Sequence, residues 1–353
     1  MIEIKEIKDL KKYNVFLYGA GNIGKQIYSV LVQNGIQIDS VFDKFASSNN
    51  VFEVINPFVD NVIDTDNSII IVTIFNRDVN YNAIKKELNK LGFTTIVSII
   101  EIFPIFSEYD FNWFWLSTNL TYLKDADLIK DLFVDEKSKE IYSQIVEARK
   151  SYSYEKLPCP ENIQNQYFSE DVPWSPIGDF IDLGAYDGDT IDSILTKKIT
   201  FDRIIAFEPD LKNFNILSEK VRSSGIHAML YPCGTYSRTT QISFSNDGSE
   251  GSKIDPSINT FSSIQCVALD DIFNNCLNQN TYIKMDIEGA ELDTLKGCQK
   301  LIKKYKPKLA VCLYHKPEDI ITIPKFLHEI HSYKFYVRQY GFYGLETVLY
   351  AIP

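Results

Sequence analysis

The chain has 353 residues, of which 45% are hydrophobic and 13% aromatic, so it can build two or three packed domains. Its net charge of −11 and the lack of a long basic run exclude nucleic acid as an expected partner. No stretch approaches the ~20 apolar residues of a membrane span, and the charged amino terminus lacks the apolar core of a signal sequence. We therefore expect a cytoplasmic protein whose six cysteines are reduced.

Residues 1–100 alternate short apolar runs with helical patterns, which predicts a parallel α/β domain. Four strands are expected, at 14–18, 38–42, 69–74 and 94–100. The first strand leads into a glycine turn with Gly19, Gly21 and Gly24, and the second strand ends in Asp43. Such a turn can hold phosphates at a helix N-terminus. The domain resembles small Rossmann-like domains, and one prediction is that it binds a nucleotide or nucleotide sugar. The alternative is a degenerate scaffold that only dimerises or docks.

Two segments of different character separate this domain from the rest of the chain. Residues 101–150 carry aromatic residues followed by two helical patterns, near 119–133 and 135–150, and predict a helical bridge. Residues 151–176 hold four prolines and predict an irregular connector. We expect Tyr167 and Phe168 in this connector to act as a lid that helps cover a ligand bound at the sheet that follows.

Strands and helices alternate again from 177 to 353, which predicts a second, larger α/β domain. Its main strands are expected at 179–183, 203–207, 226–231, 281–286 and 308–314. Helices are expected at 188–196, 211–224, 290–304 and 318–331, and short extra strands at 241–244 and 262–267. The last two strands, at 333–339 and 346–352, are predicted to form a hairpin that gives the parallel sheet an antiparallel edge.

The first strand of this domain carries the most informative motif, Phe-Ile-Asp-Leu-Gly-Ala-Tyr-Asp-Gly over residues 180–188. An apolar strand ends there in an acid and a glycine turn, and Gly184 and Gly188 are expected to let a ligand approach the backbone. The next strand ends in Glu208, where an acid can accept both hydroxyls of a ribose. The turn lacks the GxGxxG pattern, and its acids would repel a pyrophosphate. These features favour a cationic nucleoside ligand such as S-adenosylmethionine.

A second segment, rich in charged residues, lies at the end of the strand expected at 281–286. Alternation along the strand places Lys284, Asp286 and Glu288 on one side, and a buried lysine requires a carboxylate partner. Either the acids belong to a structural ion pair, or Asp286 and Glu288 face a substrate and position or deprotonate a hydroxyl. His315 ends the following strand at the same edge of the sheet, where it serves either as a general base or as a polar strand-end residue.

Residues 178–353 resemble the FkbM-type methyltransferases, which depend on S-adenosylmethionine. The stretches that carry the resemblance are FIDLGAYDGDTI, IIAFEPDLKNFNIL, VALDDIF, YIKMDIEGAELDTLKGC, LAVCLYHKPEDIITIP and ETVLYAI. The resemblance implies a seven-stranded sheet with a reversed last strand, and methyl transfer to oxygen, often on sugars or glycan precursors. It also implies a cofactor site at Asp182, Gly184, Asp187 and Glu208, with the acid of the fourth strand at Asp286. We extend this predicted site to the neighbouring residues Tyr186, Gly188 and Pro209.

The sequence thus predicts an O-methyltransferase that acts on a hydroxyl of a sugar or glycan precursor, with Asp286, Glu288 and His315 as catalytic residues. Two other functions stay open: a nucleotide-sugar oxidoreductase that uses the first domain, and a non-catalytic protein that binds S-adenosylmethionine or a glycan. The expected partner is a small-molecule or saccharide acceptor, and a homodimer is allowed. No metal site is predicted, because His328 and His331 have no further Cys or His nearby.

Overall fold

The computed structural model describes residues 4–45, 52–58, 65–109, 111, 113–245, 253–254, 263–273 and 276–353. The chain divides into two compact units. The first comprises Met1–Leu120, Gln144–Pro160 and Gly341–Leu345, and the second comprises Thr121–Ser143, Glu161–Tyr340 and Glu346–Pro353. Within the described ranges, no helix is both long and apolar enough to cross a membrane.

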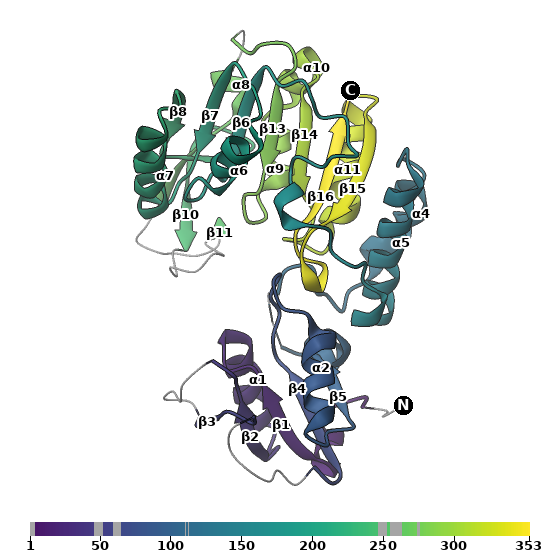
Figure 1. The fold of residues 1–353 in the computed structure, drawn as a ribbon. Helices are drawn as coiled ribbons and strands as arrows, with labels where there is room; N and C mark the ends of the chain where they lie inside the picture. Colours follow the sequence, from purple (N-terminus) through teal and green to yellow (C-terminus); the bar gives the residue numbers. More distant parts are fainter. Residues whose placement is uncertain are drawn as a thin grey trace. The chain divides into compact units, whose positions relative to one another are not determined.

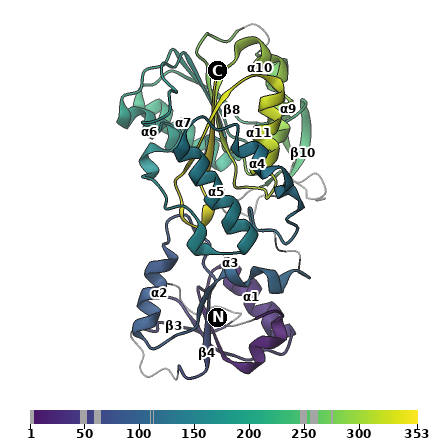
Figure 2. The same ribbon diagram turned by 90° about the vertical axis from the view of Figure 1, so that its right-hand side faces the viewer.

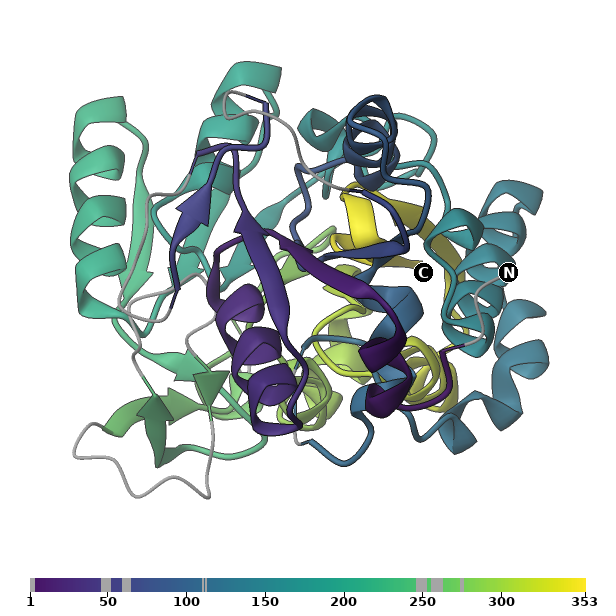
Figure 3. The ribbon, with the colours of Figure 1, turned by 90° about the horizontal axis from the view of Figure 1, so that it is seen from below.

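The first unit is built on a five-stranded parallel sheet with the order β3-β2-β1-β4-β5. Its strands are β1 (Asn14–Tyr18), β2 (Ile38–Phe42), β3 (Val54–Ile55), β4 (Ser68–Val72) and β5 (Ile96–Ser98). The helices α1 (Asn22–Gln33) and α2 (Tyr81–Lys90) connect strands of this sheet (Figures 1 and 3). All five residues of β4 are buried, which explains its uninterrupted run of apolar residues.

The last strand of this sheet is shorter than the sequence suggests. A strand is expected over 94–100, but β5 ends at Ser98 and the short helix α3 (Ile99–Ile102) follows at once. The reason is a capping box, in which the Ser98 hydroxyl accepts from the backbone of Glu101 and the Glu101 carboxylate accepts from the backbone of Ser98. This reciprocal pair stabilises the start of a helix over the continuation of the strand.

The segments between the two sheets form short helices. The expected helix near 119–133 is only a 3-10 turn, η3 (Thr121–Asp125), followed by α4 (Ala126–Lys130), whereas the second expected helix is α5 (Glu136–Ser151). Because the division between the units falls within α5, residues 101–150 do not form a unit of their own. The other 3-10 turns are η1 (Ile7–Lys12), η2 (Phe103–Phe106), η4 (Tyr154–Lys156), η5 (Ile163–Asn165) and η6 (Phe342–Gly344).

The second unit contains a seven-stranded sheet with the order β15-β16-β14-β13-β6-β7-β8. Its strands are β6 (Asp179–Leu183), β7 (Arg203–Phe207), β8 (Ala228–Tyr231), β13 (Tyr282–Met285), β14 (Lys308–Cys312), β15 (Lys334–Gln339) and β16 (Thr347–Ile352). The first five of these are parallel, and β16 runs antiparallel to both β14 and β15. This arrangement confirms the predicted α/β fold with its antiparallel hairpin.

Helices cover both faces of this sheet. Figure 2 shows α6 (Asp189–Lys197) and α7 (Leu211–Ser224) on one side, and α9 (Glu291–Lys296), α10 (Gln299–Tyr305) and α11 (Asp319–Ile330) on the other. The single helix expected at 290–304 is therefore two helices. The break lies at Gly297, where any side chain would collide with the backbone carbonyl of Tyr236. The chain can thus pass this contact only at a glycine.

The two extra strands that the sequence predicts belong to a separate small sheet. Its order is β11-β10-β12-β9, formed by β9 (Gly234–Thr235), β10 (Thr240–Ser245), β11 (Lys253–Ile254) and β12 (Ser263–Val267). The short helix α8 (Leu269–Ile272) follows β12 directly. These elements lie between β8 and β13 in the chain and leave the carboxyl ends of the main parallel strands in one row.

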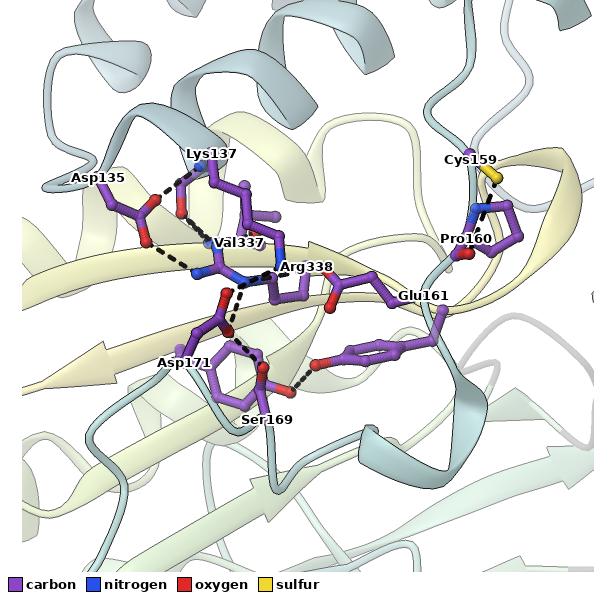
Figure 4. Close-up of polar contacts among 12 residues, drawn as sticks. Asp135, Lys137, Cys159, Pro160, Glu161, Ser169, Asp171, Val337 and Arg338 are labelled. Carbon is purple, nitrogen blue, oxygen red and sulfur yellow. Dashed lines mark hydrogen bonds and ion pairs between the residues drawn. The ribbon is translucent and has the colours of Figure 1, made fainter.

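A buried arginine ties the helical segment and the connector to the antiparallel hairpin. The Arg338 side chain on β15 is 1% exposed, and its guanidinium contacts Asp135 at 2.8 Å and Asp171 at 3.0 Å (Figure 4). It also donates to the Ser138 hydroxyl at 2.8 Å. Since Asp135 precedes α5 and Asp171 lies in the connector, one guanidinium fixes three segments that are far apart in the sequence.

Replacing Arg338 with leucine is expected to lower the free energy of unfolding of the second unit by about 3–5 kcal/mol, because it leaves carboxylates without their buried partner. The matched control is Arg222→Leu, since the Arg222 side chain is 72% exposed and pairs with Glu219 on the surface of α7. That control is expected to change stability by no more than about 0.5 kcal/mol. Urea unfolding followed by tryptophan fluorescence measures both, and equal stability of the two variants would contradict the anchoring role.

Candidate active site

The predicted site residues lie along one edge of the large sheet, because four neighbouring parallel strands end there. The strands β14, β13, β6 and β7 are adjacent, and ligands bind beyond the carboxyl ends of such strands. Gly184 follows β6, Glu208 follows β7 and Asp286 follows β13, while His315 lies three residues beyond β14. Segments more than a hundred residues apart in sequence are thereby brought to one rim.

The glycine turn after β6 is shaped by the neighbouring strand. Gly184 has a φ of +77°, and a Cβ at this position would collide with the carbonyl oxygen of Asp286. The backbone of Asp286 in turn donates to the carbonyl oxygen of Leu183 at 3.1 Å. The expectation that Gly184 is bare so that a ligand can approach stays a prediction. The missing side chain is required by the close approach of the β13 backbone.

A buried ion pair supports this turn from below. The Lys284 ammonium lies 3.0 Å from the Asp182 carboxylate and donates to the carbonyl oxygen of Gly184 at 2.6 Å. Burial raises the pKa of Asp182 to about 6, with the Lys284 charge opposing the shift. Burial alone would lower the pKa of Lys284, but the charges of Asp182 and Asp286 reverse the effect and raise it. Lys284 therefore belongs to a structural ion pair, and its partner Asp182 supports the turn from the interior.

Glu208 lies at the end of β7 in a conformation fixed by the backbone. Its carboxylate accepts from the N–H of Tyr186 at 2.9 Å and from the N–H of Asp210 at 2.8 Å. Burial raises the pKa of Glu208 to about 7, although these two hydrogen bonds lower it. A carboxylate has about four acceptor sites, so two backbone bonds leave capacity for a further pair of hydroxyl donors. The side chain of Asp187, in the same turn, is 38% exposed.

The Asp286 carboxylate accepts hydrogen bonds from two tyrosine hydroxyls, one on each of its oxygens. The Tyr167 hydroxyl donates to Oδ2 at 2.7 Å, and the Tyr314 hydroxyl donates to Oδ1 at 3.4 Å. Burial raises the pKa of Asp286, but the positive charges of Lys284 and His315 outweigh burial and lower it. Asp286 is therefore a poor proton acceptor and a stable negative charge at the rim.

The connector contributes to the site through only one of its two aromatic residues. Tyr167 reaches Asp286, as described above, and its ring lies 5.2 Å from the Lys284 ammonium. Phe168 is instead 1% exposed and packs against Phe180 and Tyr282 at the opposite, amino ends of β6 and β13. The expectation that Phe168 covers a ligand at the rim is thus wrong, since its ring belongs to the sheet core.

His315 lies within a ring of carboxylates. Its Nδ1 lies 2.8 Å from the Glu291 carboxylate, and its Nε2 lies 3.3 Å from Asp286 and 3.6 Å from Glu288. The strand β13 ends before Glu288, which adopts a φ of +54°, so the Glu288 position is set by a turn and not by strand alternation. Side chains from the ends of β13 and β14 and from the start of α9 meet here, as the sequence predicts for Asp286, Glu288 and His315.

The charge state of His315 differs from the sequence expectation. Burial alone would lower its pKa, but Glu291, Glu288 and Asp286 together raise the pKa to about 10. At neutral pH the imidazole is then already protonated and has no lone pair with which to accept a proton. This charge state argues against the predicted role of His315 as a general base near neutral pH, and the positive charge lies among the carboxylates around it.

Sequence reasoning missed one residue of this cluster, Glu291. Glu291 is completely buried and accepts from the backbone of Ile287 at 3.0 Å as well as contacting His315. It follows Asp286 by five residues in the same acidic run, so an acid at the start of a helix facing the strand ends was the available signal. Tyr314, beside His315, is expected at this rim from its place at the strand end, but its hydrogen bond to Asp286 has no signal in the sequence.

The glycine motif of the first unit shows the packing expected of such a turn. A Cβ at Gly24 would collide with the carbonyl oxygen of Gly19, so α1 crosses close to the end of β1. Asp43, at the end of β2, accepts from the backbone of Ala20 and of Phe45, each at 2.8 Å. This carboxylate therefore braces the turn. A nucleotide at Gly19, Gly21, Gly24 and Asp43 stays a prediction.

Comparison with known proteins indicates the family of the domain that is built on the large sheet. The family model of the methyltransferase FkbM domain matches residues 182–342, which contain the whole rim from Asp182 to His315. The chain contains an FkbM methyltransferase domain. This match supports an S-adenosylmethionine-dependent methyltransferase. No curated protein gives a significant match to the chain.

Solved structures with a similar fold include that of the FkbM methyltransferase from Methylobacillus flagellatus KT. It has a TM-score of 0.77 at 18% identity and covers 98% of this chain and 92% of that one. Aeropyrum pernix fibrillarin in complex with natively bound S-adenosyl-L-methionine has a TM-score of 0.33 at 12% identity, covering 52% of this chain and 70% of that one. The putative rRNA methylase from Clostridium thermocellum has a TM-score of 0.35 at 12% identity, covering 56% of this chain and 99% of that one. The likeness at a TM-score of 0.77 shows the fold.

The rim of the FkbM domain fits S-adenosylmethionine. Glu208 is held by two backbone bonds and keeps acceptor capacity for the ribose hydroxyls. The acid Asp187 is exposed in the turn beside it, where it tolerates a sulfonium cation and would repel a pyrophosphate. The chemistry of these donors and acceptors agrees with the cofactor of the family.

Cofactor affinity is expected to depend on pH through Glu208. Because the folded-state pKa is raised to about 7, the Glu208 carboxylate that is predicted to accept the ribose hydroxyls forms only as the pH rises through that value. The affinity for S-adenosylmethionine should therefore increase between pH 6 and 8 and fall by up to about tenfold per unit below the pKa. Calorimetric titration at a series of pH values measures this dependence.

Variants of Glu208 test this assignment. Glu208→Gln should flatten the pH dependence, and Glu208→Ala should weaken binding by about 2–4 kcal/mol through loss of charge-assisted hydrogen bonds. Glu219→Gln on the exposed face of α7 removes the same charge away from the rim and should change neither property. An affinity of Glu208→Ala equal to that of the wild type would remove Glu208 from the cofactor site.

Proposed function

We propose that the FkbM domain transfers a methyl group to a hydroxyl of a sugar or glycan precursor. The observation that carries this proposal is the pair of acidic side chains beside His315, whose exposed fractions are 22% for Asp286 and 27% for Glu288. Carboxylates accept hydrogen bonds from hydroxyl groups, and a sugar offers several such groups close together. Acids at the acceptor end of the rim therefore favour a polyhydroxylated substrate.

When bound, S-adenosylmethionine would supply an electrophilic methyl group for transfer to the acceptor oxygen, with its sulfur as the leaving group. The domain's main contribution is to hold the acceptor hydroxyl in line with this methyl group, since alignment of two reactants lowers the barrier strongly. The hydroxyl also loses its proton, and we assign the accepting group to the Glu288 carboxylate. His315 is already protonated, and the pKa of Asp286 is lowered, so both accept a proton less readily.

The two rival functions have weaker support. A non-catalytic binding protein does not account for an FkbM domain with a complete acidic cluster at its rim. A nucleotide-sugar oxidoreductase would place its chemistry in the first unit, where Asp43 is engaged with the glycine turn. Methyl transfer by the second unit is the function that uses the residues assembled there.

The two acids are expected to have separable effects. Glu288→Gln should lower turnover by at least about 100-fold, the lower end of general-base assistance, while the affinity for S-adenosylmethionine is unchanged. Asp286→Asn should lower turnover and also weaken cofactor binding, since the negative charge of Asp286 acts on Lys284, which donates to the carbonyl oxygen of Gly184 in the cofactor-side turn. Glu318→Gln, at an exposed position three residues after His315, is the matched control and should keep full turnover. Normal turnover of Glu288→Gln would contradict its role as the base.

The acceptor class is tested by methyl transfer from S-adenosylmethionine with a labelled methyl group. The acceptors are a panel of free sugars, nucleotide sugars and oligosaccharides, with amines and carboxylic acids as alternatives. The proposal predicts label in an O-methyl ether, identified by the carbon chemical shift of the product. Label only in N-methyl or methyl-ester products would overturn it.

A further inference from the structure

We propose that Asp286, Glu288 and His315 form a binding site for one divalent transition-metal cation such as Mn²⁺. Each residue offers one ligand atom, and these three atoms all lie within 4.8 Å of one another. They comprise one imidazole nitrogen and two carboxylate oxygens. This goes beyond the sequence, which predicts no metal site because it offers no His or Cys cluster with zinc spacing.

The separations fit ligands of a common ion. The Nε2 of His315 lies 3.3 Å from Oδ1 of Asp286 and 3.6 Å from Oε2 of Glu288. Two ligands that are each about 2.1 Å from a metal ion lie roughly 3.0–3.4 Å apart at octahedral or tetrahedral angles. Direct hydrogen bonds to a charged group are instead about 2.7–2.9 Å long. The separation of 3.3 Å falls within the range for neighbouring ligands, and that of 3.6 Å lies just above it.

The environment of His315 is that of a histidine oriented for metal binding. Its Nδ1 lies 2.8 Å from the carboxylate of the completely buried Glu291. A carboxylate accepts the Nδ1 proton, fixes the tautomer and directs Nε2 toward Asp286 and Glu288; binding of the cation displaces the Nε2 proton, because a ligating imidazole is neutral. Metal-ligating histidines almost always have such a carboxylate or carbonyl partner on their other nitrogen. Glu291 is itself held by the backbone of Ile287, so the imidazole has one orientation.

The two carboxylates are also positioned for this role. The Tyr167 hydroxyl bonds to Oδ2 of Asp286, which leaves Oδ1 as the atom nearest to His315. Both acidic side chains keep about a quarter of their surface exposed, so an ion there retains open positions for water or an acceptor oxygen. The imidazole favours a first-row transition cation over Mg²⁺, and the two carboxylate oxygens are ligands that suit Mn²⁺ among these cations.

A cation at this position would bind the acceptor hydroxyl, and this part of the inference rests on the proposed function. A hydroxyl bound to a divalent ion loses its proton more readily, here to Glu288 or to water, and its oxygen then attacks the methyl carbon while the carbon–sulfur bond breaks. Binding of the cation itself depends only on the three side chains. It is therefore measured without cofactor or acceptor.

The test uses the full chain after treatment with a chelator. Mn²⁺ is added and the free ion is followed by electron paramagnetic resonance, with one bound ion per chain expected. Glu288→Gln should weaken binding at least about tenfold, whereas the matched variant Glu318→Gln, which loses the same charge nearby, should bind as the wild type does. Equal affinity of wild type and Glu288→Gln, or no bound ion in the wild type, would overturn the site.

A second measurement on the wild type does not depend on any variant folding. Bound Mn²⁺ broadens nuclear resonances close to it, and the chain has four histidines that serve as reporters. The ring signals of His315 should broaden at one equivalent of Mn²⁺, while those of His227, His328 and His331 should not. Broadening of another histidine in preference to His315 would contradict the site. If Mn²⁺ binds but no methyl group is transferred to a hydroxyl, the proposed function is refuted and the metal site stands.

Discussion

The ammonium group of Lys284 lies in the interior between β13 and β6, where its side chain is 2% exposed and pairs with the fully buried Asp182. Burying such a charge costs several kcal/mol unless its hydrogen bonds are satisfied. Lys284 meets this requirement with Asp182 and with the carbonyl oxygen of Gly184. One buried pair therefore fixes the turn on the cofactor side of the rim, and its positive charge lowers the pKa of Asp286 on the acceptor side.

The connector, residues 151–176, also holds the Lys284 and Asp286 side chains at the rim in place. Tyr167 lies against the Lys284 ammonium and donates to Asp286, so its ring covers the pair while its hydroxyl orients the acid. Asp171, four residues later, is bonded to the buried guanidinium of Arg338. The connector is thus anchored at both the sheet edge and the rim, and it behaves as part of the site's framework.

Much of the large sheet follows from sequence alone, because its strands are short apolar runs that end in acids or glycines. The positions of Asp286, Glu288 and His315 at one rim follow in the same way from the rule for parallel sheets. The reason for Gly184 does not follow, since the atom that excludes a side chain there belongs to Asp286, about a hundred residues away. The protonation of His315 is likewise set by Glu291 and Glu288, whose proximity only the folded chain shows.

The claim that the Lys284 pair positions the cofactor turn is tested most directly by removing both charges at once. In the double variant Asp182→Asn and Lys284→Met no uncompensated charge is buried, so the fold should be retained with a thermal midpoint close to that of the wild type. Calorimetric titration should nevertheless show that the affinity for S-adenosylmethionine falls at least about tenfold, because the Gly184 carbonyl has lost its charged donor. A folded double variant that binds the cofactor as tightly as the wild type would contradict the account.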